Sequence, residues 1–383
     1  MALDADTDLL TTYGFVALRG IHEGDEVYHP SGPLTRVTGA LEIMRDRDCY
    51  CITTTDGRSV VADRDHLWTV VDKRRARSVG PRGNTFRWFE TVTLTTGEIA
   101  AAGVSRYKAG SRTSVADGKR YTVNEYRFQL PVQEPVMSPE VTLPIDPYVL
   151  GAWLGDGTTS GAGLTSADPE VIDEIRRAGQ PCVQAADSRL IQWRLSDGIR
   201  RGRGHGAGTL HARLRVLGVL GNKHVPDSYL TAGSSQREAL LHGLMDTDGT
   251  IDINRGQVEF CSTLRPLADA VCFLARSLGW RATIRTGRAM LNGQDYGMKY
   301  RVFFTPKTTD PFCPFRLPRK VARIRDIDGN KGRTTLSIAA IELVASRPVR
   351  CIQVESSDGL FLAGRDLFPT HNSSIKRLIT IAG

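Results

Sequence analysis

The chain has 383 residues, of which 40% are hydrophobic, and 50 Lys and Arg against 42 Asp and Glu give it a formal net charge of +8. This composition is typical of a folded protein of two or three domains, and the modest basic excess is compatible with a nucleic-acid partner. No run approaches the roughly 18 uncharged apolar residues of a membrane span. Seven scattered cysteines favour a reducing compartment, the cytoplasm, over a disulfide framework.

β segments are predicted at both ends of the chain. Residues 49–62 have the pattern of a β-hairpin, with Asp56-Gly57 as its two-residue turn. From about Lys73 to residue 140 the sequence is basic and irregular, with a few β-like pieces. Helical segments begin at Pro144, and β character returns from Thr334. The pattern predicts a β-rich module interrupted by a mixed α/β insert.

One motif occurs twice in this insert, as VLGAWLGDG at 149–157 and LHGLMDTDG at 241–249. Each copy is an apolar helical turn with small residues on one face and Asp-Gly at its end, and glycine there is a helix-stop signal. If the two helices pack side by side, Asp156 and Asp248 meet. Paired carboxylates suit a hard cation such as Mg²⁺, which can activate water for phosphodiester hydrolysis. Taken singly, each Asp-Gly would be an ordinary helix C-terminal turn.

The two copies resemble the LAGLIDADG motifs of homing endonucleases, although the first departs from the pattern at Trp153 and Gly155. The resemblance implies an α+β endonuclease domain over 141–318 that acts as a monomer on double-stranded DNA. It makes Asp156 and Asp248 the Mg²⁺ ligands. It also implies that Lys223 orients the attacking water, and Lys307 is a weaker candidate for a second such lysine. The alternative for Lys223 is a solvated surface lysine.

Two basic runs are candidates for phosphate contacts. Lys73-Arg74-Arg75-Ala76-Arg77 forms one run. The other has no acidic residue in it and contains Arg200, Arg201, Arg203, Arg213 and Arg215. Each phosphate contact would add to the salt sensitivity of DNA binding. The alternative for both runs is a solvated loop.

A second set of reactive residues lies near the C-terminus, where His371-Asn372-Ser373 places an asparagine beside a hydroxyl nucleophile. An asparagine side chain can attack its own backbone carbonyl, form a succinimide and cut the chain. His371 is placed to share protons in that step. On its own this tripeptide would be an ordinary turn.

Together with Ala2–Gly14, Val60–His66 and Val349–Leu362, the tripeptide resembles the terminal motifs of an intein. This resemblance covers nearly the whole chain. It implies an all-β, horseshoe-like Hint splicing domain, formed by residues 2–140 and 319–372 and split by the endonuclease domain. Residues 373–383 would then be a fragment of the downstream extein. The DNA target would be the intein-less allele of the host gene.

Most inteins begin with a Cys or Ser nucleophile, but the matching residue here is Ala2. Trp68, Cys351 and Thr370 match the Trp-Cys-Thr triplet of class 3 inteins, in which the internal cysteine attacks the N-terminal scissile bond directly. Alternatively, Cys351 is a buried strand thiol, Trp68 a core residue and Thr370 a turn hydroxyl.

The resemblance assigns the remaining steps as well. His66 would polarise or protonate the scissile amide, Ser373 would accept the upstream segment, and cyclisation of Asn372 would release the intein without a cofactor. Asp63 stands where the motif of His66 commonly has Thr. Gly359 stands where a later motif often has His, so cyclisation would rest more heavily on His371.

Other interpretations stay open. The chain is alternatively a stand-alone DNA-binding endonuclease with an inert β scaffold, or a degenerate element that neither splices nor cuts. Cys49-x-Cys51 suggests zinc, but no second pair has metal spacing. Ser373-Ser374 before a helix-like stretch could complete a phosphate-binding loop, which makes a P-loop NTPase the expected host. With only Met1 before Ala2, we expect the sequence to be a fragment or to have a misplaced start.

Overall fold

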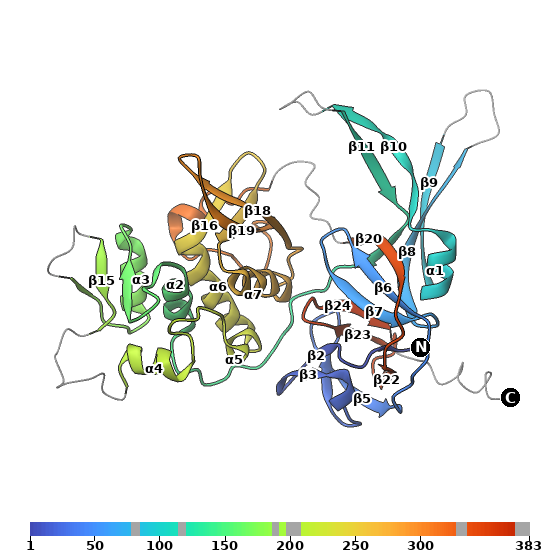
Figure 1. Ribbon diagram of the computed structural model, residues 1–383, viewed down its shortest axis with the longest axis horizontal. Coiled ribbons are helices and arrows are strands. Elements are labelled where there is room, and N and C mark those ends of the chain that lie inside the picture. Colours follow the sequence, from blue (N-terminus) through green and yellow to red (C-terminus); the bar gives the residue numbers. More distant parts are fainter. Residues whose placement is uncertain (78–84, 114–119, 186–190, 197–207, 327–334, 372–383) are drawn as a thin grey trace. The chain divides into compact units, whose positions relative to one another are not determined.

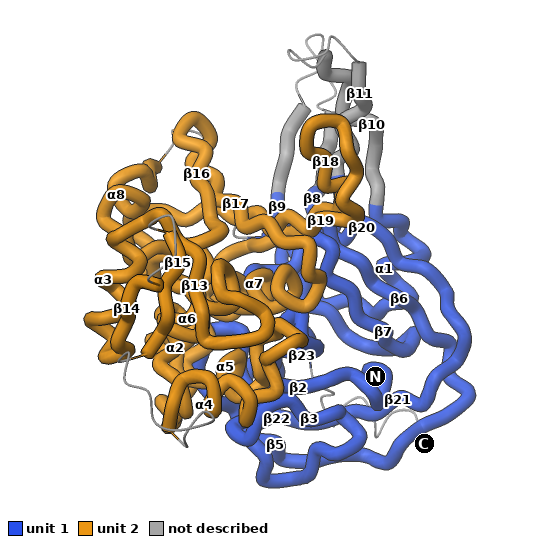
Figure 2. Tube along the Cα trace, turned by 60° about the vertical axis from the view of Figure 1, so that its left-hand side comes forward, with its two compact units in different colours: residues 1–133, 333–383 blue, residues 134–332 orange. Residues whose placement is uncertain are grey.

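The computed structural model describes residues 1–77, 85–113, 120–185, 191–196, 208–326 and 335–371. The chain divides into two compact units, residues 1–133 with 333–383 and residues 134–332 (Figure 2). The boundaries expected from the sequence were 140/141 and 318/319. Residues 134–140 instead lie in unit 2, where Val136 donates to Ser277 O and accepts from Arg237. Lys320 lies there too, because its ammonium binds the end of a unit 2 helix.

Unit 1 is built mostly of antiparallel strands (Figure 1). The largest sheet has the strand order β21-β1-β7-β6-β20-β12-β8-β9, and a second has the order β22-β5-β4-β2-β3. The elements are β1 (Leu3–Asp4), β2 (Asp8–Thr11), β3 (Gly14–Ala17), β4 (Glu26–Tyr28), β5 (Leu34–Ala40), β6 (Cys49–Thr54), β7 (Ser59–Asp63), β8 (Leu67–Arg77), β9 (Thr85–Thr95), α1 (Thr96–Ala102), β10 (Ser105–Thr113), β11 (Arg120–Tyr126), β12 (Phe128–Pro131), β20 (Thr335–Val344), β21 (Val349–Arg350), β22 (Ile352–Val354), β23 (Leu360–Ala363) and β24 (Phe368–His371).

Both ends of the chain contribute to the core of unit 1. β6 and β7 form the predicted hairpin, and Gly57 in its turn has a φ of +86° that favours glycine. The core contains Val37 and Ile52 from the N-terminal part and Phe361 and Phe368 from the C-terminal part. The β-like pieces predicted in the segment after Lys73 were confirmed, since residues 91–95 lie in β9 and residues 121–130 lie largely in β11 and β12, but more of the segment is strand than expected. β8 continues to Arg77 and pairs with β9, because a hairpin partner satisfies backbone groups whatever the side-chain charge.

Unit 2 combines helices with small antiparallel sheets, as the sequence predicted. Its main sheet has the order β16-β17-β19-β18. Among its described helices, as among those of unit 1, none is long and apolar enough to cross a membrane. The elements are α2 (Pro147–Asp156), β13 (Gly163–Thr165), α3 (Pro169–Arg177), β14 (Val183–Gln184), β15 (Gln192–Arg194), α4 (Leu210–Val216), α5 (Asp227–Leu230), α6 (Ser234–Asp248), β16 (Gly249–Asp252), β17 (Gln257–Ser262), α7 (Arg265–Ser277), β18 (Thr283–Leu291), β19 (Gln294–Phe304) and α8 (Pro318–Val321).

The two repeated motifs form α2 and the end of α6, which pack side by side as predicted (Figure 1). Three glycines let the backbones touch. A methyl group at Gly151 would overlap the backbone of Leu240, and one at Gly243 would overlap the backbone of Tyr148 and Ala152. The third, Gly155, lies against Thr247. The small residues of the motif therefore set the distance between the helices.

We predict that Gly243→Ala lowers the free energy of unfolding by about 3 kcal/mol, because the methyl group meets rigid backbone and forces the helices apart. For a unit of this size, the melting temperature should fall by roughly 6–12 °C. Gly161→Ala is the matched control, since its methyl would make only ordinary contacts with His211 and Thr158. Thermal unfolding followed by circular dichroism measures both. Equal melting temperatures for the two variants would contradict the packing argument.

Candidate functional sites

The packing of α2 against α6 brings Asp156 and Asp248 together, each as the last residue of its helix. Both side chains are half-buried. Burial raises the pKa of Asp248 to about 6, and the charge of Asp156 adds to this rise. Burial also raises the pKa of Asp156, against the lowering effect of two nearby lysines. Two partly desolvated carboxylates thus face a shared space.

Both helices end at Asp-Gly as predicted, but the reason given for the glycines was wrong. Gly157 and Gly249 have φ values of −72° and −91°, which any residue adopts. A side chain at Gly157 would instead overlap Trp153, and one at Gly249 would overlap Met245. Glycine is needed here because the chain turns back closely over the helix end.

Two lysines cap the paired helix ends in matching ways. Lys223 donates to Leu154 O at 3.0 Å and to Gly155 O at 3.1 Å. Lys320 donates to the carbonyls at the end of α6, including Asp246 O at 2.7 Å and Gly249 O at 2.8 Å. Burial lowers the pKa of both ammonium groups, that of Lys320 to about 8. Both interact electrostatically with Asp156 and Asp248.

Lys320 was missed by the sequence analysis, which named Lys307 as the second lysine. The backbone amide of Lys307 binds Asp310, and the lysines whose charges act on both carboxylates are Lys223 and Lys320. Nothing in the sequence around Pro318-Arg319-Lys320 resembles the segment around Lys223. Lys223 and Lys320 correspond only in the folded structure, where each ammonium donates to the carbonyls at the end of one motif helix.

The carboxylate pair suits a cation that keeps part of its water shell. Among the described residues, no group of three or more His, Cys, Asp and Glu side chains is placed to hold a metal ion. Asp156 and Asp248 supply two oxygen ligand groups, and their mutual repulsion would be relieved by a positive charge between them. This donor set fits a Mg²⁺-like ion, which prefers oxygen and commonly binds through one or two carboxylates.

The arginines proposed for DNA contacts are engaged or lie outside the described residues. Arg213 donates to Pro144 O and to Gln180 Oε1, within unit 2. Arg215 lies 3.1 Å from His211 Nε2. These contacts give both guanidinium groups a structural role in the fold. The remaining members of the run, Arg200, Arg201 and Arg203, lie outside the described residues.

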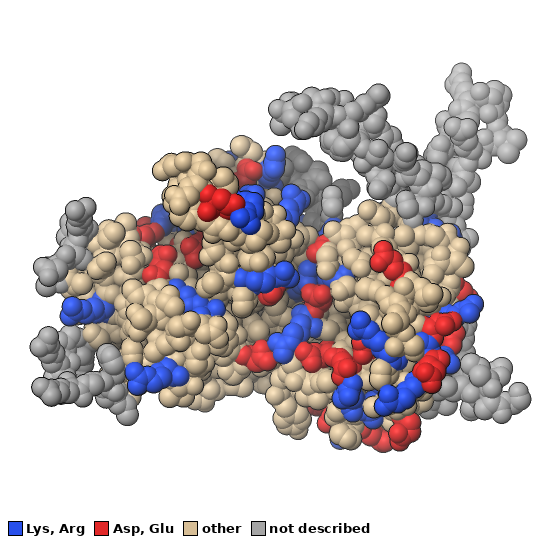
Figure 3. Space-filling model, viewed as in Figure 1, with Lys and Arg blue, Asp and Glu red and all other residues tan. Residues whose placement is uncertain are grey.

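The outer face of the unit 2 sheet carries a basic strip, formed by Arg285, Lys299 and Arg301, that the sequence analysis missed. Arg285 and Arg301 are direct cross-strand partners on β18 and β19, and Lys299 lies two residues from Arg301. Both arginines stack on Phe303, while Val302 and Phe304 point into the core. Acidic side chains are interspersed with these charges (Figure 3), and Glu259 pairs with Arg301. No local charge run marks this face in the sequence.

In unit 1 the first strand brings Ala2 and Cys351 to the same point. β1 pairs with β21 in the register Leu3↔Arg350, so the next pair outward is Ala2 with Cys351. Both are buried in one small apolar cluster with Cys49 and Val349. Cys351 Sγ lies 3.4 Å from Ile352 O. Cys351 therefore lies in the same buried cluster as Ala2.

His66, Trp68 and Thr370 form a second group in this unit. His66 Nε2 lies 2.5 Å from Thr370 Oγ1, and the Trp68 ring meets the His66 ring edge-on with 4.7 Å between centroids. Trp68 itself is held by a bond from Nε1 to Thr96 Oγ1. The contacts of Trp68 and Thr370 thus orient His66.

His66 is buried, and this burial keeps its pKa well below the usual value, helped by the nearby N-terminal ammonium and His371. The imidazole is therefore neutral. Its Nδ1 has no hydrogen-bond partner among the described residues. A buried imidazole nitrogen without a partner is destabilising, so its retention indicates a functional role.

The C-terminal group is described only in part. His371 is the last residue of β24 and pairs with Leu360 on β23. It is close enough to His66 to affect its pKa. Asn372 and Ser373 lie outside the described residues.

Residues 235–303 match the family model of the LAGLIDADG-like domain. Over 385 aligned residues, the chain is 33% identical to a replicative DNA helicase DnaB of Mycobacterium intracellulare. That alignment covers 98% of the chain and 59% of the relative. Over nearly its whole length, the chain is therefore similar to part of a replicative DNA helicase DnaB, and residues 235–303 are similar to the LAGLIDADG-like domain.

The chain spans about three fifths of the length of that relative. A replicative DNA helicase DnaB of Mycobacterium leprae (strain TN) is 34% identical over 115 residues, which is 30% of the chain and 17% of that protein. Low similarity extends to two solved structures. One is the Msm DnaB1 intein splicing domain bound with zinc (11% identity, TM-score 0.29, 97% of this chain and 99% of that chain). The other is a variant of I-DmoI with its target DNA and Mn (15% identity, TM-score 0.28, 42% of this chain and 87% of that chain).

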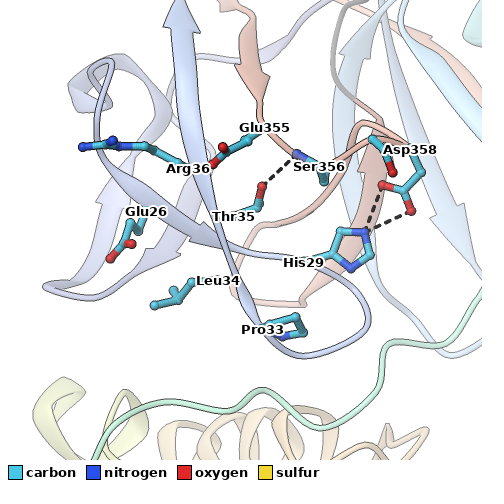
Figure 4. Close-up of a pocket in the computed structure, with 10 residues that line it drawn as sticks. Glu26, His29, Pro33, Leu34, Thr35, Arg36, Glu355, Ser356 and Asp358 are labelled. Atoms are coloured by element: carbon cyan, nitrogen blue, oxygen red, sulfur yellow. Dashed lines mark hydrogen bonds and ion pairs between the residues drawn. The ribbon is translucent and has the colours of Figure 1, made fainter.

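Unit 1 also has a surface pocket of about 780 Å³ between the β4–β5 turn and residues 355–358 (Figure 4). In it, His29 Nε2 lies 3.0 Å from Asp358 Oδ1, and the Ser31 amide donates to His29 Nδ1. The Ser31 hydroxyl binds the same nitrogen. Because Nδ1 accepts a hydrogen bond from the Ser31 amide, the ring proton lies on Nε2, which donates a hydrogen bond to Asp358. The cluster links the β4–β5 turn to the turn before β23, and so positions β23, which pairs with β24.

Proposed function

We propose that this chain is an intein, that it excises itself from a host protein by class 3 splicing, and that unit 2 cuts double-stranded DNA for homing. The register of Ala2 with Cys351 carries the first part of this proposal. Since Ala2 offers no side-chain nucleophile, the thiol facing it is the group available to attack the preceding carbonyl.

The first splicing step joins the upstream segment to Cys351. Its Sγ attacks the carbonyl carbon before Ala2, the C–N bond breaks, and the thiol proton passes to the Ala2 nitrogen. A thiolate is a strong nucleophile even where only a few per cent of the thiol is ionised. His66, neutral and with a free Nδ1, supplies a hydrogen bond to the reacting amide. Trp68 and Thr370 keep that ring in place.

The later steps use the other end of the chain. Ser373 attacks the thioester and takes the upstream segment, and Cys351 regains its proton. Asn372 then cyclises with help from His371, which breaks its peptide bond to Ser373. An acyl shift from oxygen to nitrogen leaves an ordinary peptide bond between the flanking segments. No cofactor enters this sequence.

The relatives' name supports a host of the same kind. We infer that the flanking segments are two parts of a replicative DNA helicase DnaB, which would make the host a P-loop NTPase. The DNA target is then the intein-less copy of that gene.

For the DNA reaction, Asp156 and Asp248 would hold Mg²⁺, which lowers the pKa of bound water and balances charge on the leaving oxygen. Lys223 and Lys320, fixed over the helix ends, orient the attacking water and stabilise charge on the phosphate. The strip of Arg285, Lys299 and Arg301 would contact the DNA backbone. Arg285 and Arg301 lie directly opposite one another, and Glu259 offsets the charge of Arg301. Asp248 acts on the pKa of Cys261, beside Arg301, so this strip adjoins the carboxylates.

The splicing proposal is tested by placing foreign segments before Ala2 and after Asn372. Intact-mass spectrometry should find the two segments ligated and the excised intein ending in a succinimide. If DNA is cut while no ligated product or succinimide forms, the chain is an endonuclease with an inert β scaffold.

We predict that Lys223→Met and Lys320→Met each slow DNA cutting by about 10²-fold, because each removes a buried ammonium beside the reacting groups. Lys307→Met, the matched control, should cut at the parent rate. Single-turnover cutting of the intein-less site with Mg²⁺ measures all three. A parent rate for Lys320→Met would remove that lysine from the proposed site.

A further inference from the structure

A fully buried carboxylate, Asp63, binds the residue that follows the scissile bond. It lies at the end of β7 and has no exposed surface. Its Oδ1 accepts from the Ala2 amide at 2.9 Å, and its own amide donates to Ala2 O at 2.9 Å. Asp63 therefore holds both backbone polar groups of Ala2.

The surroundings of Asp63 are suited to a positive charge. Arg47 donates to Asp63 Oδ2 at 3.2 Å and to the exposed Asp65 at 2.5 Å. A buried carboxylate is strongly unfavourable unless it is paired, and a threonine or an apolar residue would avoid that penalty. The carboxylate therefore calls for an explanation beyond folding.

The first splicing step produces a new positive group at this point. When Cys351 Sγ bonds to the carbonyl carbon and the C–N bond breaks, Ala2 is left with a free amine. An α-amino group has an ordinary pKa of about 8, and a neighbouring carboxylate favours its charged form. The released amine takes a proton from solvent and becomes an ammonium. Because the ammonium has no lone pair, it cannot attack the thioester and reverse the step.

We propose that Asp63 is a catalytic residue of the first splicing step. Its carboxylate accepts the N–H of the scissile amide and so aligns that amide, and it then holds the released Ala2 amine as an ammonium. This inference rests on the proposed splicing function. It also explains why a carboxylate stands where related motifs commonly have threonine.

The test uses the chain with a foreign upstream segment and the changes Asn372→Ala and Ser373→Ala, so that the reaction stops after the thioester. Release of the upstream segment by a small added thiol is timed at pH 6.5 and pH 8.5. Asp63→Asn should slow release roughly 10- to 100-fold at pH 8.5, as expected for a hydrogen bond to a charged group. The loss should be much smaller at pH 6.5, where the amine is protonated without help.

Three comparisons make this result specific. Asp65→Asn is the matched control, since it touches Arg47 but has no bond to Ala2, and it should release at the parent rate at both pH values. Asp63→Thr should show the same pH-dependent loss as Asp63→Asn, which guards against one variant that folds poorly. Comparing variant with parent at each pH cancels the titration of the groups they share here, Arg47, His66 and His371.

The outcomes separate this inference from the function on which it rests. If the parent releases nothing, the splicing proposal is wrong and the role of Asp63 falls with it. If the parent releases its segment and Asp63→Asn does so equally fast, only the role of Asp63 is overturned. An equal loss at both pH values would assign Asp63 a purely structural role and would also overturn the inference.

Discussion

Replacement of Cys351 by alanine is expected to abolish splicing and thiol-induced release of an upstream segment. Ala2 has no nucleophilic side chain, and the β1–β21 register places the Cys351 thiol opposite it. Without that thiol no thioester forms, so the rate should fall below detection. An SDS gel and the intact mass of the chain, with and without a small thiol, measure this outcome.

Cys49→Ala is the matched control for this change. Cys49 is buried in the same apolar cluster as Ala2 and Cys351, and it also offers a free thiol. Because it is not the cross-strand neighbour of Ala2, its loss should leave splicing near the parent rate. If Cys351→Ala still splices and Cys49→Ala does not, the nucleophile has been assigned to the wrong cysteine.

Asp156→Asn and Asp248→Asn are each expected to remove DNA cutting while DNA binding persists. The two carboxylates are the charged oxygen ligands at the paired helix ends, and an amide in place of either weakens the hold on a divalent cation. Cutting of the intein-less site is measured with Mg²⁺, and binding is measured by gel shift with Ca²⁺.

Two controls accompany this prediction. Asp269→Asn, on the exposed side of α7, should cut at the parent rate. Splicing should survive both active-site changes, because the two chemistries use different residues. Cutting by Asp156→Asn or Asp248→Asn at the parent rate would contradict the assignment of the metal site.

Local patterns in the sequence predicted the helices and the hairpin well. The Asp56-Gly57 turn and the two motif helices were read correctly because each depends on residues a few positions apart. The close packing of α2 on α6 also followed from the sequence, since small residues repeat on one face of each helix.

Features that depend on residues far apart in the chain were missed. The place of Lys320 is set by the way residues 313–320 return to the end of α6, where Asp246 accepts from the amides of Arg316 and Leu317. The basic strip on the sheet arises from the pairing of β18 with β19, which no single segment encodes. Asp63 was seen only as a departure from a motif, because its bonds to Ala2 cross 61 positions.

The most direct measurement is to locate the thioester itself. The chain with an upstream segment and the changes Asn372→Ala and Ser373→Ala, which block cyclisation and transfer to Ser373, is digested at low pH, which preserves thioesters, and its peptides are sequenced by tandem mass spectrometry. Our account predicts that the mass of the upstream C-terminal peptide is attached to Cys351. Its attachment to another residue, or its presence only in an uncleaved amide before Ala2, would contradict the internal-cysteine mechanism.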